Sequence, residues 1–180
     1  MGVYNEDSVC FHGRLRPQGK KRLIFRRFHH AGDRHSEKFL PASGRAHDAA
    51  SDGVWLSKAK HADAAVVCFG VNDLFRVEGG ACLKDDLRYI ARTLQESGVK
   101  VLLETVPPFD YSGAVRETWL GVNRFILEEM KSEADGVFDV VPVHGCEDDI
   151  AWARYERHPN ESGNAAWTEA IYWAVKQMLN

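Results

Sequence analysis

The sequence predicts an α/β fold in which a parallel sheet carries helices on both faces. Three short apolar runs are rich in β-branched residues and bounded by Gly, Asp or Pro, as buried parallel strands tend to be, and they span residues 62–69, 99–106 and 137–143. Helical patterns lie between these runs. Because strands and helices alternate along the chain, we expect parallel strands joined by right-handed crossovers.

The expected helices are recognised by apolar residues that recur on one face. In the clearest helix these residues fall at i, i+4, i+7, i+8 and i+11, namely Leu83, Leu87, Ile90, Ala91 and Leu94. Gly98 then supplies a C-terminal stop. A second helix is expected over residues 115–131, and a third from residue 162 toward the C-terminus. Residues 48–60 form a weaker helix candidate.

Two more strands are expected near the N-terminus, at residues 2–5 and 38–42. Residues 13–34 are compatible with a helix, a strand or a long loop. Together with the three buried runs, these segments predict a flavodoxin-like three-layer α/β/α sandwich with a parallel sheet of about five strands. The chain shows no repeat, low-complexity tract or domain boundary, so we expect a single domain over residues 1–180.

Composition narrows the function classes. The formal net charge is −3, whereas a nucleic-acid-binding protein normally carries a strong basic excess, so no nucleic-acid partner is expected. The four cysteines form no Cys-x-x-Cys pair, and Cys68 lies within an apolar run, as a buried core thiol would. The histidines between residues 29 and 47 lack a recognisable ligand spacing, so neither a metal nor another cofactor is expected.

The chain as written is expected to be cytoplasmic. It has no apolar run of the roughly 18 residues that a membrane span needs, and its first residues lack the apolar core of a signal peptide. The first strand candidate starts almost at residue 1, so a truncated or misassigned start could have removed a leader and would then change this expectation. The sequence leaves the oligomeric state open.

Three motifs carry residues with catalytic potential. In open parallel sheets, ligands bind beyond the carboxyl ends of the strands. The motif Gly70-Val71-Asn72-Asp73 directly follows a buried run, so it is expected at such an end. The asparagine amide can stabilise an oxyanion, although taken alone the segment is more typical of an ordinary Asn-Asp turn after a strand. His158 lies just before the last expected helix, where it could serve as a general base or simply belong to a loop that caps the helix. Ser8 lies just after the first strand candidate, where its hydroxyl could act as a nucleophile or cap a helix.

Taken in chain order, these motifs resemble those of the SGNH (GDSL-type) hydrolases. Residues 70–73 and the run His158-Pro159-Asn160-Glu161-Ser162-Gly163 match two of the family's blocks at the right separation. Ala42-Ser43-Gly44-Arg45 looks like the second block, and Asp7-Ser8 looks like the end of the Gly-Asp-Ser block. The resemblance extends over nearly the whole chain, from about residue 3 to residue 179.

The resemblance implies an esterase that forms an acyl-enzyme. Ser8 would attack an ester carbonyl, and His158 would take the serine proton and later deliver it to the leaving alcohol. The N–H groups of Ser8 and Gly44 and the side chain of Asn72 would hold the oxyanion. By the same analogy, the partner is a small-molecule ester, and carbohydrate O-acetyl groups are one option.

Two positions depart from the family's pattern. Glu6 replaces the glycine that precedes Asp-Ser, and Tyr155 replaces the aspartate that usually lies three residues before the histidine. Glu156, Asp148, Asp149 or a backbone carbonyl would then have to orient the imidazole. These departures affect the site more than the fold. Two alternatives therefore stay open: a degenerate domain that binds a carbohydrate or a protein, and an O-acyltransferase.

Overall fold

The protein contains a parallel sheet, as the sequence predicts. The computed structural model describes residues 23–24, 46, 62–76, 79–144, 159 and 161–180. Within these residues four strands lie in the order β1 (Leu23–Ile24), β2 (Ala64–Val67), β3 (Lys100–Glu104) and β4 (Gly136–Phe138). All three neighbouring pairs run parallel, which confirms the α/β class.

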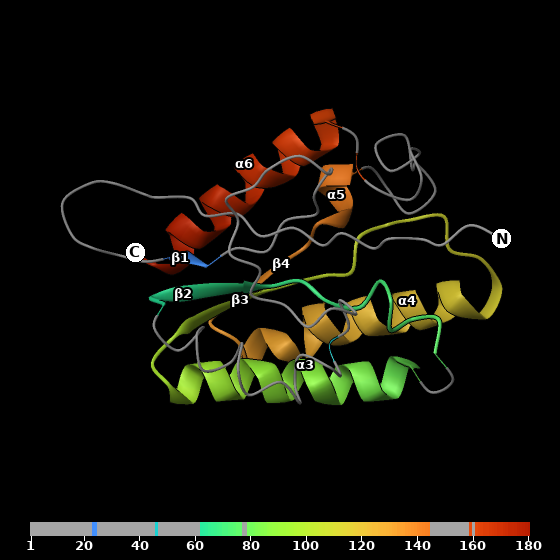
Figure 1. The fold of residues 1–180 in the computed structure, drawn as a ribbon, viewed down its shortest axis with the longest axis horizontal. Helices are drawn as coiled ribbons and strands as arrows, with labels where there is room; N and C mark the ends of the chain where they lie inside the picture. Colours follow the sequence, from blue (N-terminus) through green and yellow to red (C-terminus); the bar gives the residue numbers. More distant parts are fainter. Residues whose placement is uncertain (1–22, 25–45, 47–61, 77–78, 145–158, 160) are drawn as a thin grey trace, which may run out of the picture.

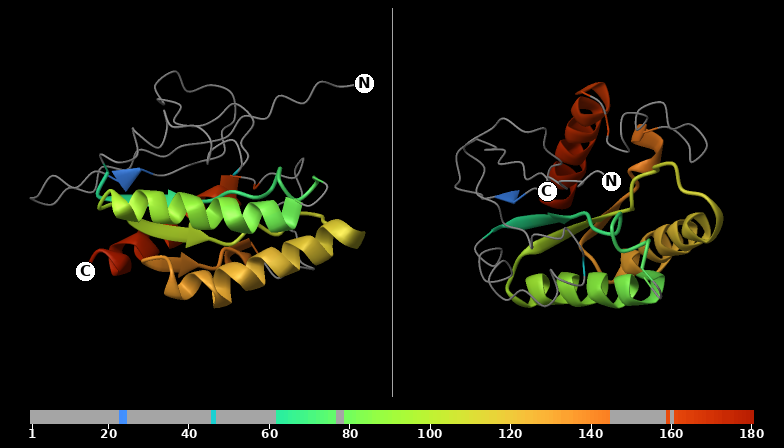
Figure 2. Two further views of the ribbon diagram at one scale, coloured as in Figure 1. Left: turned by 90° about the horizontal axis from the view of Figure 1, so that it is seen from below. Right: turned by 45° about the vertical axis from the view of Figure 1, so that its right-hand side comes forward.

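Helices cover both faces of the sheet (Figures 1 and 2). On one face lie α3 (Gly79–Glu96) and α4 (Gly113–Glu128), which is followed by the 3-10 turn η1 (Met130–Ser132). On the other face lie α5 (Val141–His144) and α6 (Glu161–Met178). None of the described helices is long and apolar enough to cross a membrane.

The two faces of the sheet form separate apolar cores because successive strand residues point to opposite sides. Val101 and Leu103 of β3 are buried with the apolar faces of α3 and α4. Leu102, which lies between them, is buried with Trp167 and Val175 of α6. A strand that is covered on both faces needs apolar residues at every position, which explains why this segment shows no alternation in the sequence.

The expected strand over residues 137–143 is wrong in its second half. β4 ends at Phe138, and Val141–His144 form the short helix α5. Asp139 is the local cause, because its Oδ1 accepts hydrogen bonds from the Val141 N–H at 3.1 Å and from the Thr105 hydroxyl at 3.0 Å. A side chain that bonds a nearby backbone N–H offers the chain an alternative to the strand.

The N-terminal part of the sheet also differs from expectation. The described residues contain four strands rather than about five, and β1 falls within residues 13–34, where the pattern is compatible with any element. A strand with two paired residues is too short to produce a periodic signal. The strands expected at residues 2–5 and 38–42, and the weak helix candidate at 48–60, lie outside the described residues.

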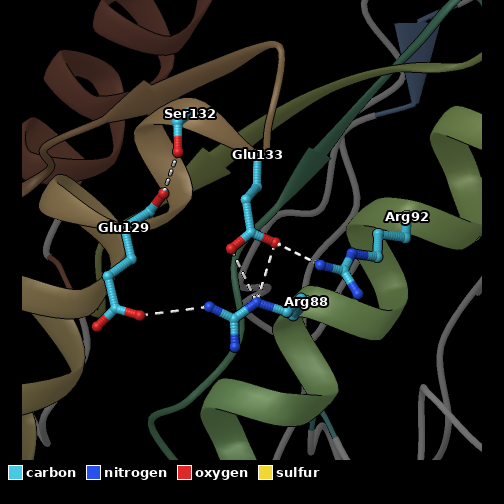
Figure 3. A network of polar contacts seen from close by, with 5 residues as sticks. All are labelled: Arg88, Arg92, Glu129, Ser132 and Glu133. Atoms are coloured by element: carbon cyan, nitrogen blue, oxygen red, sulfur yellow. Dashed lines mark hydrogen bonds and ion pairs between the residues drawn. The ribbon is translucent and has the colours of Figure 1, made fainter.

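A network of charged side chains joins α3 to Glu129 at the end of α4 and to Glu133 just after η1 (Figure 3). Arg88 Nε lies 2.9 Å from both carboxylate oxygens of Glu133, and Arg88 Nη2 lies 3.3 Å from Glu129. Arg92 also donates to Glu133, at 3.0 Å. The hydrogen bonds from Arg88 outweigh desolvation and hold the pKa of Glu133 below its usual value.

Glu133→Ala is expected to lower the free energy of unfolding by about 1 kcal/mol, because it removes the carboxylate that both arginines share. Arg92→Ala is the matched control. The Arg92 side chain is 62% exposed, so its loss should change stability by no more than about 0.5 kcal/mol. Urea unfolding measures both effects, and added salt should reduce the larger one. Equal losses for the two variants would contradict this assignment.

Candidate active site

The turn after β2 is built around Gly70. Its carbonyl accepts hydrogen bonds from the N–H groups of Asp73 and Leu74, each at 3.0 Å. Gly70 has a φ of +130°, a conformation that residues with a Cβ rarely adopt. A Cβ placed there would also lie 2.6 Å from Val106 Cγ2. The sequence therefore needs glycine at this position for both backbone conformation and space.

Asn72 lies in this turn, half-buried at the carboxyl end of β2. This is the edge of the sheet at which the sequence predicts a site. A side-chain amide at such an edge can present N–H donors to a ligand beyond the strand ends. The structure thus confirms the position of Asn72 in the fold, while its role as an oxyanion donor stays a prediction.

Asp73 connects this turn to a distant part of the chain. Its side chain is buried, and its Oδ2 accepts a hydrogen bond of 3.0 Å from the backbone N–H of Ala46. Ala46 is also buried and lies two residues after Gly44, the glycine expected to supply an oxyanion N–H. The structure therefore brings the chain just after residues 42–45 against residues 70–73.

The last helix begins where the sequence places its histidine motif. Pro159 is buried, and its carbonyl accepts a hydrogen bond of 3.0 Å from the Asn164 side chain in α6. The first turn of α6 lies near α5, on the side of the sheet where the strands end (Figure 1). The segment directly after His158 is therefore anchored to the helix that follows it.

Most of the expected catalytic residues lie outside the described residues. They are the expected nucleophile Ser8, the expected base His158 and the oxyanion glycine Gly44. The candidate acids Glu156, Asp148 and Asp149 also lie outside, as do Glu6 and Tyr155, the two residues that depart from the family's pattern. Their roles stay predictions. Within the part of the chain that the structure describes, no three His, Cys, Asp or Glu side chains gather as a metal site.

A buried polar cluster on the α6 side of the sheet was missed by sequence reasoning. Glu104, at the end of β3, is fully buried and accepts a hydrogen bond of 3.2 Å from Trp167 Nε1. Burial raises the pKa of Glu104 to about 7, although hydrogen bonds from Cys68 and Trp167 oppose the shift. Cys68 is buried, as expected. The signal was present in the sequence, because Glu104 lies two residues after Leu102 and so shares its face of the strand.

His144 contacts the same tryptophan. Its ring packs edge-on against Trp167 with centroids 4.9 Å apart, and neither ring nitrogen has a hydrogen-bond partner among the described residues. Desolvation lowers the pKa of His144 to about 4, so the imidazole is neutral near pH 7. The sequence pattern did not predict the burial of His144, because the expected strand ended at residue 143 and the helix α5 was not expected.

The sequence pattern of one known protein family matches most of the chain. This is the GDSL-like Lipase/Acylhydrolase family, and the match covers residues 10–166. The chain belongs to this family. The match includes residues 70–73 and 158–163, and Ser8 lies two residues before its start. Neither a curated protein nor a solved structure matches the chain. The resemblance inferred from the motifs is thus confirmed at the level of the family.

Proposed function

We propose that this GDSL-family protein is a serine ester hydrolase that cleaves small acyl esters, carbohydrate O-acetyl groups among them, through an acyl-enzyme. The observation that carries the proposal is the turn at residues 70–73. It follows a buried parallel strand, it requires glycine at its first position, and Asp73 ties it to the chain after residue 45. Membership of an acylhydrolase family supports the same reaction class.

In the proposed reaction, Ser8 Oγ forms a bond to the ester carbonyl carbon while His158 accepts the serine proton. The carbonyl becomes an oxyanion, held by the N–H groups of Ser8 and Gly44 and by the Asn72 amide. His158 then delivers its proton to the leaving alcohol as the ester bond breaks. Water releases the acyl group as a carboxylic acid by the same steps, with the histidine again as base.

His158 needs a group that orients its imidazole. A neutral imidazole is a better base when a partner on its second nitrogen fixes the tautomer. Because Tyr155 occupies the usual aspartate position, Glu156, Asp148 and Asp149 are the candidates. If none of them serves, a Ser-His dyad remains, and a slower acylation step is expected.

The direct test measures p-nitrophenyl acetate turnover and fluorophosphonate labelling in the wild-type protein, Ser8→Ala and Ser132→Ala. Both signals should vanish in Ser8→Ala. Both should persist in Ser132→Ala, because this serine is exposed at the end of η1 and its hydroxyl donates to the carbonyl of Glu129. Labelling that survives in Ser8→Ala would assign the nucleophile to another residue.

Two other outcomes separate the alternatives. A wild-type protein that neither turns over the ester nor labels, but binds a carbohydrate or a protein, would point to a degenerate site. Acylated product that appears when a competing alcohol is added would indicate acyl transfer rather than hydrolysis, because both reactions share the acyl-enzyme.

A further inference from the structure

The peptide backbone at Val106, just beyond the end of β3, is held by two side chains of α4. Asn123 Oδ1 accepts a hydrogen bond of 2.7 Å from the Val106 N–H, and Asn123 Nδ2 donates to the Val106 carbonyl at 3.0 Å. Trp119 Nε1 donates to the same carbonyl at 2.8 Å. All three residues are buried. A single amide that bonds both the N–H and the C=O of one residue fixes its position and its orientation.

The side chain of Val106 in turn fixes Gly70. Val106 Cγ2 would lie 2.6 Å from a Cβ at Gly70, and Leu83 Cδ2 would lie 3.0 Å from it, so the Gly70 backbone packs directly against these side chains. The Gly70 carbonyl also holds the N–H groups of Asp73 and Leu74. Residues 70–74 are therefore expected to move as one unit, and their position depends on where Val106 lies.

We propose that Asn123 is a positioning residue for Asn72. It acts through Val106 and Gly70, and it sets the turn that carries the amide expected to bind the oxyanion. The inference rests on the proposed function, because it assigns Asn72 that role. Oxyanion donors must lie within about 2.7–3.1 Å of the developing charge, so a small shift of the turn is enough to weaken the interaction.

The chemistry of position 123 supports a positioning role over simple packing. An apolar side chain at this buried position would remove the hydrogen bond that the buried Val106 N–H makes to α4, whereas the asparagine amide is tolerated there because its own hydrogen bonds are satisfied. Its oxygen and its nitrogen both bond the same residue of the loop. The bonds join α4 to the loop after β3, next to the candidate site.

The test is a double-mutant cycle on the full chain, with p-nitrophenyl acetate as substrate. Asn72→Ala should lower kcat by roughly a hundredfold or more. Asn123→Leu keeps the branching and the number of side-chain heavy atoms but removes both hydrogen bonds, and it should lower kcat by about tenfold with KM unchanged. If Asn123 acts through Asn72, the double variant should be no slower than Asn72→Ala alone. Ile126→Val, a buried α4 change without a hydrogen bond, is the control and should leave kcat unchanged.

A second measurement does not depend on turnover. Hydrogen exchange of the Asp73 and Leu74 amides should be faster in Asn123→Leu than in wild type, while exchange at Val175 in α6 stays the same. Trp119→Phe, which removes only one bond to Val106, should show a smaller change in the same direction. It also provides a milder variant if Asn123→Leu does not fold.

Multiplicative losses in the double variant, an unchanged kcat in Asn123→Leu, or unchanged exchange at Asp73 and Leu74 would each overturn the inference. An unchanged kcat in Asn72→Ala would overturn it as well, by removing the donor that it invokes. The proposed function is judged separately, because it stands or falls on labelling of Ser8.

Discussion

Gly70→Ala is expected to destabilise the protein by about 3 kcal/mol and to abolish ester turnover. Two effects combine. The glycine has a φ of +130°, which an L-residue rarely adopts, and the new methyl group would lie 2.6 Å from Val106 Cγ2. Val106 has little freedom to move aside, because its backbone is bonded to Asn123 and Trp119. Relief would require the whole turn to shift, and Asn72 with it.

Two glycines provide matched controls for the strain and the contact. Gly98 has a φ of +82°, but a methyl group at this position would have no atom within 4 Å, so Gly98→Ala tests backbone strain alone and should lower stability by about 1 kcal/mol. Gly121 lies within α4 with equally open space, so Gly121→Ala should raise stability by roughly 0.5–1 kcal/mol. Urea unfolding measures the stability of all three glycine-to-alanine variants. A Gly70→Ala protein no less stable than Gly98→Ala would show that the contact with Val106 is unimportant.

Removing either Glu104 or His144 is expected to reveal a strong pH dependence of stability that the wild type conceals. The pKa of Glu104 is raised from 4.5 to about 7 in the folded protein, whereas the pKa of His144 is lowered from 6.5 to about 4. Both shifts come chiefly from desolvation of a buried group. Each is equivalent to roughly 3 kcal/mol of unfolding free energy across its own pH window.

The two contributions have opposite signs. Between about pH 4.5 and 7 the folded state keeps the Glu104 proton that the unfolded state has lost, so this group makes stability fall as pH rises. Between about pH 6.5 and 4 the unfolded state binds a proton at His144 that the folded state does not, so this group makes stability fall as pH drops. Where the windows overlap, the two slopes offset each other.

Urea unfolding between about pH 4 and 8 separates the contributions of Glu104 and His144 to the pH dependence of stability. In Glu104→Gln the His144 effect remains, so stability relative to wild type should rise with pH through the overlap. In His144→Phe the Glu104 effect remains, and relative stability should fall with pH. This variant should also be more stable near neutral pH by about 1–2 kcal/mol, because it removes two buried nitrogens that lack hydrogen bonds to the described residues. Parallel stability curves for both variants and wild type would refute the assignment.

Helix α3 and the turn after β2 illustrate which features of the fold can be predicted from the sequence. The helix around Leu83, Leu87 and Leu94 was predicted because its apolar residues repeat locally, and all three are fully buried. The motif at residues 70–73 was predicted at the end of β2 because a buried strand and a glycine stand next to each other in the chain. In both cases the signal lies within a few residues of the feature.

The sequence by itself therefore determined the α/β class, the main helices, the buried strands β2 and β3, and the likeness to the GDSL family. Only the tertiary structure decided which distant groups meet. Trp167 donates to Glu104 across 63 positions, Ala46 donates to Asp73 across 27, and Asn123 holds Val106 across 17. Local periodicity reports which face of an element is apolar, but not which partner lies opposite a polar side chain. That choice follows from the packing of the helices against the sheet, which decides which buried polar groups meet a partner.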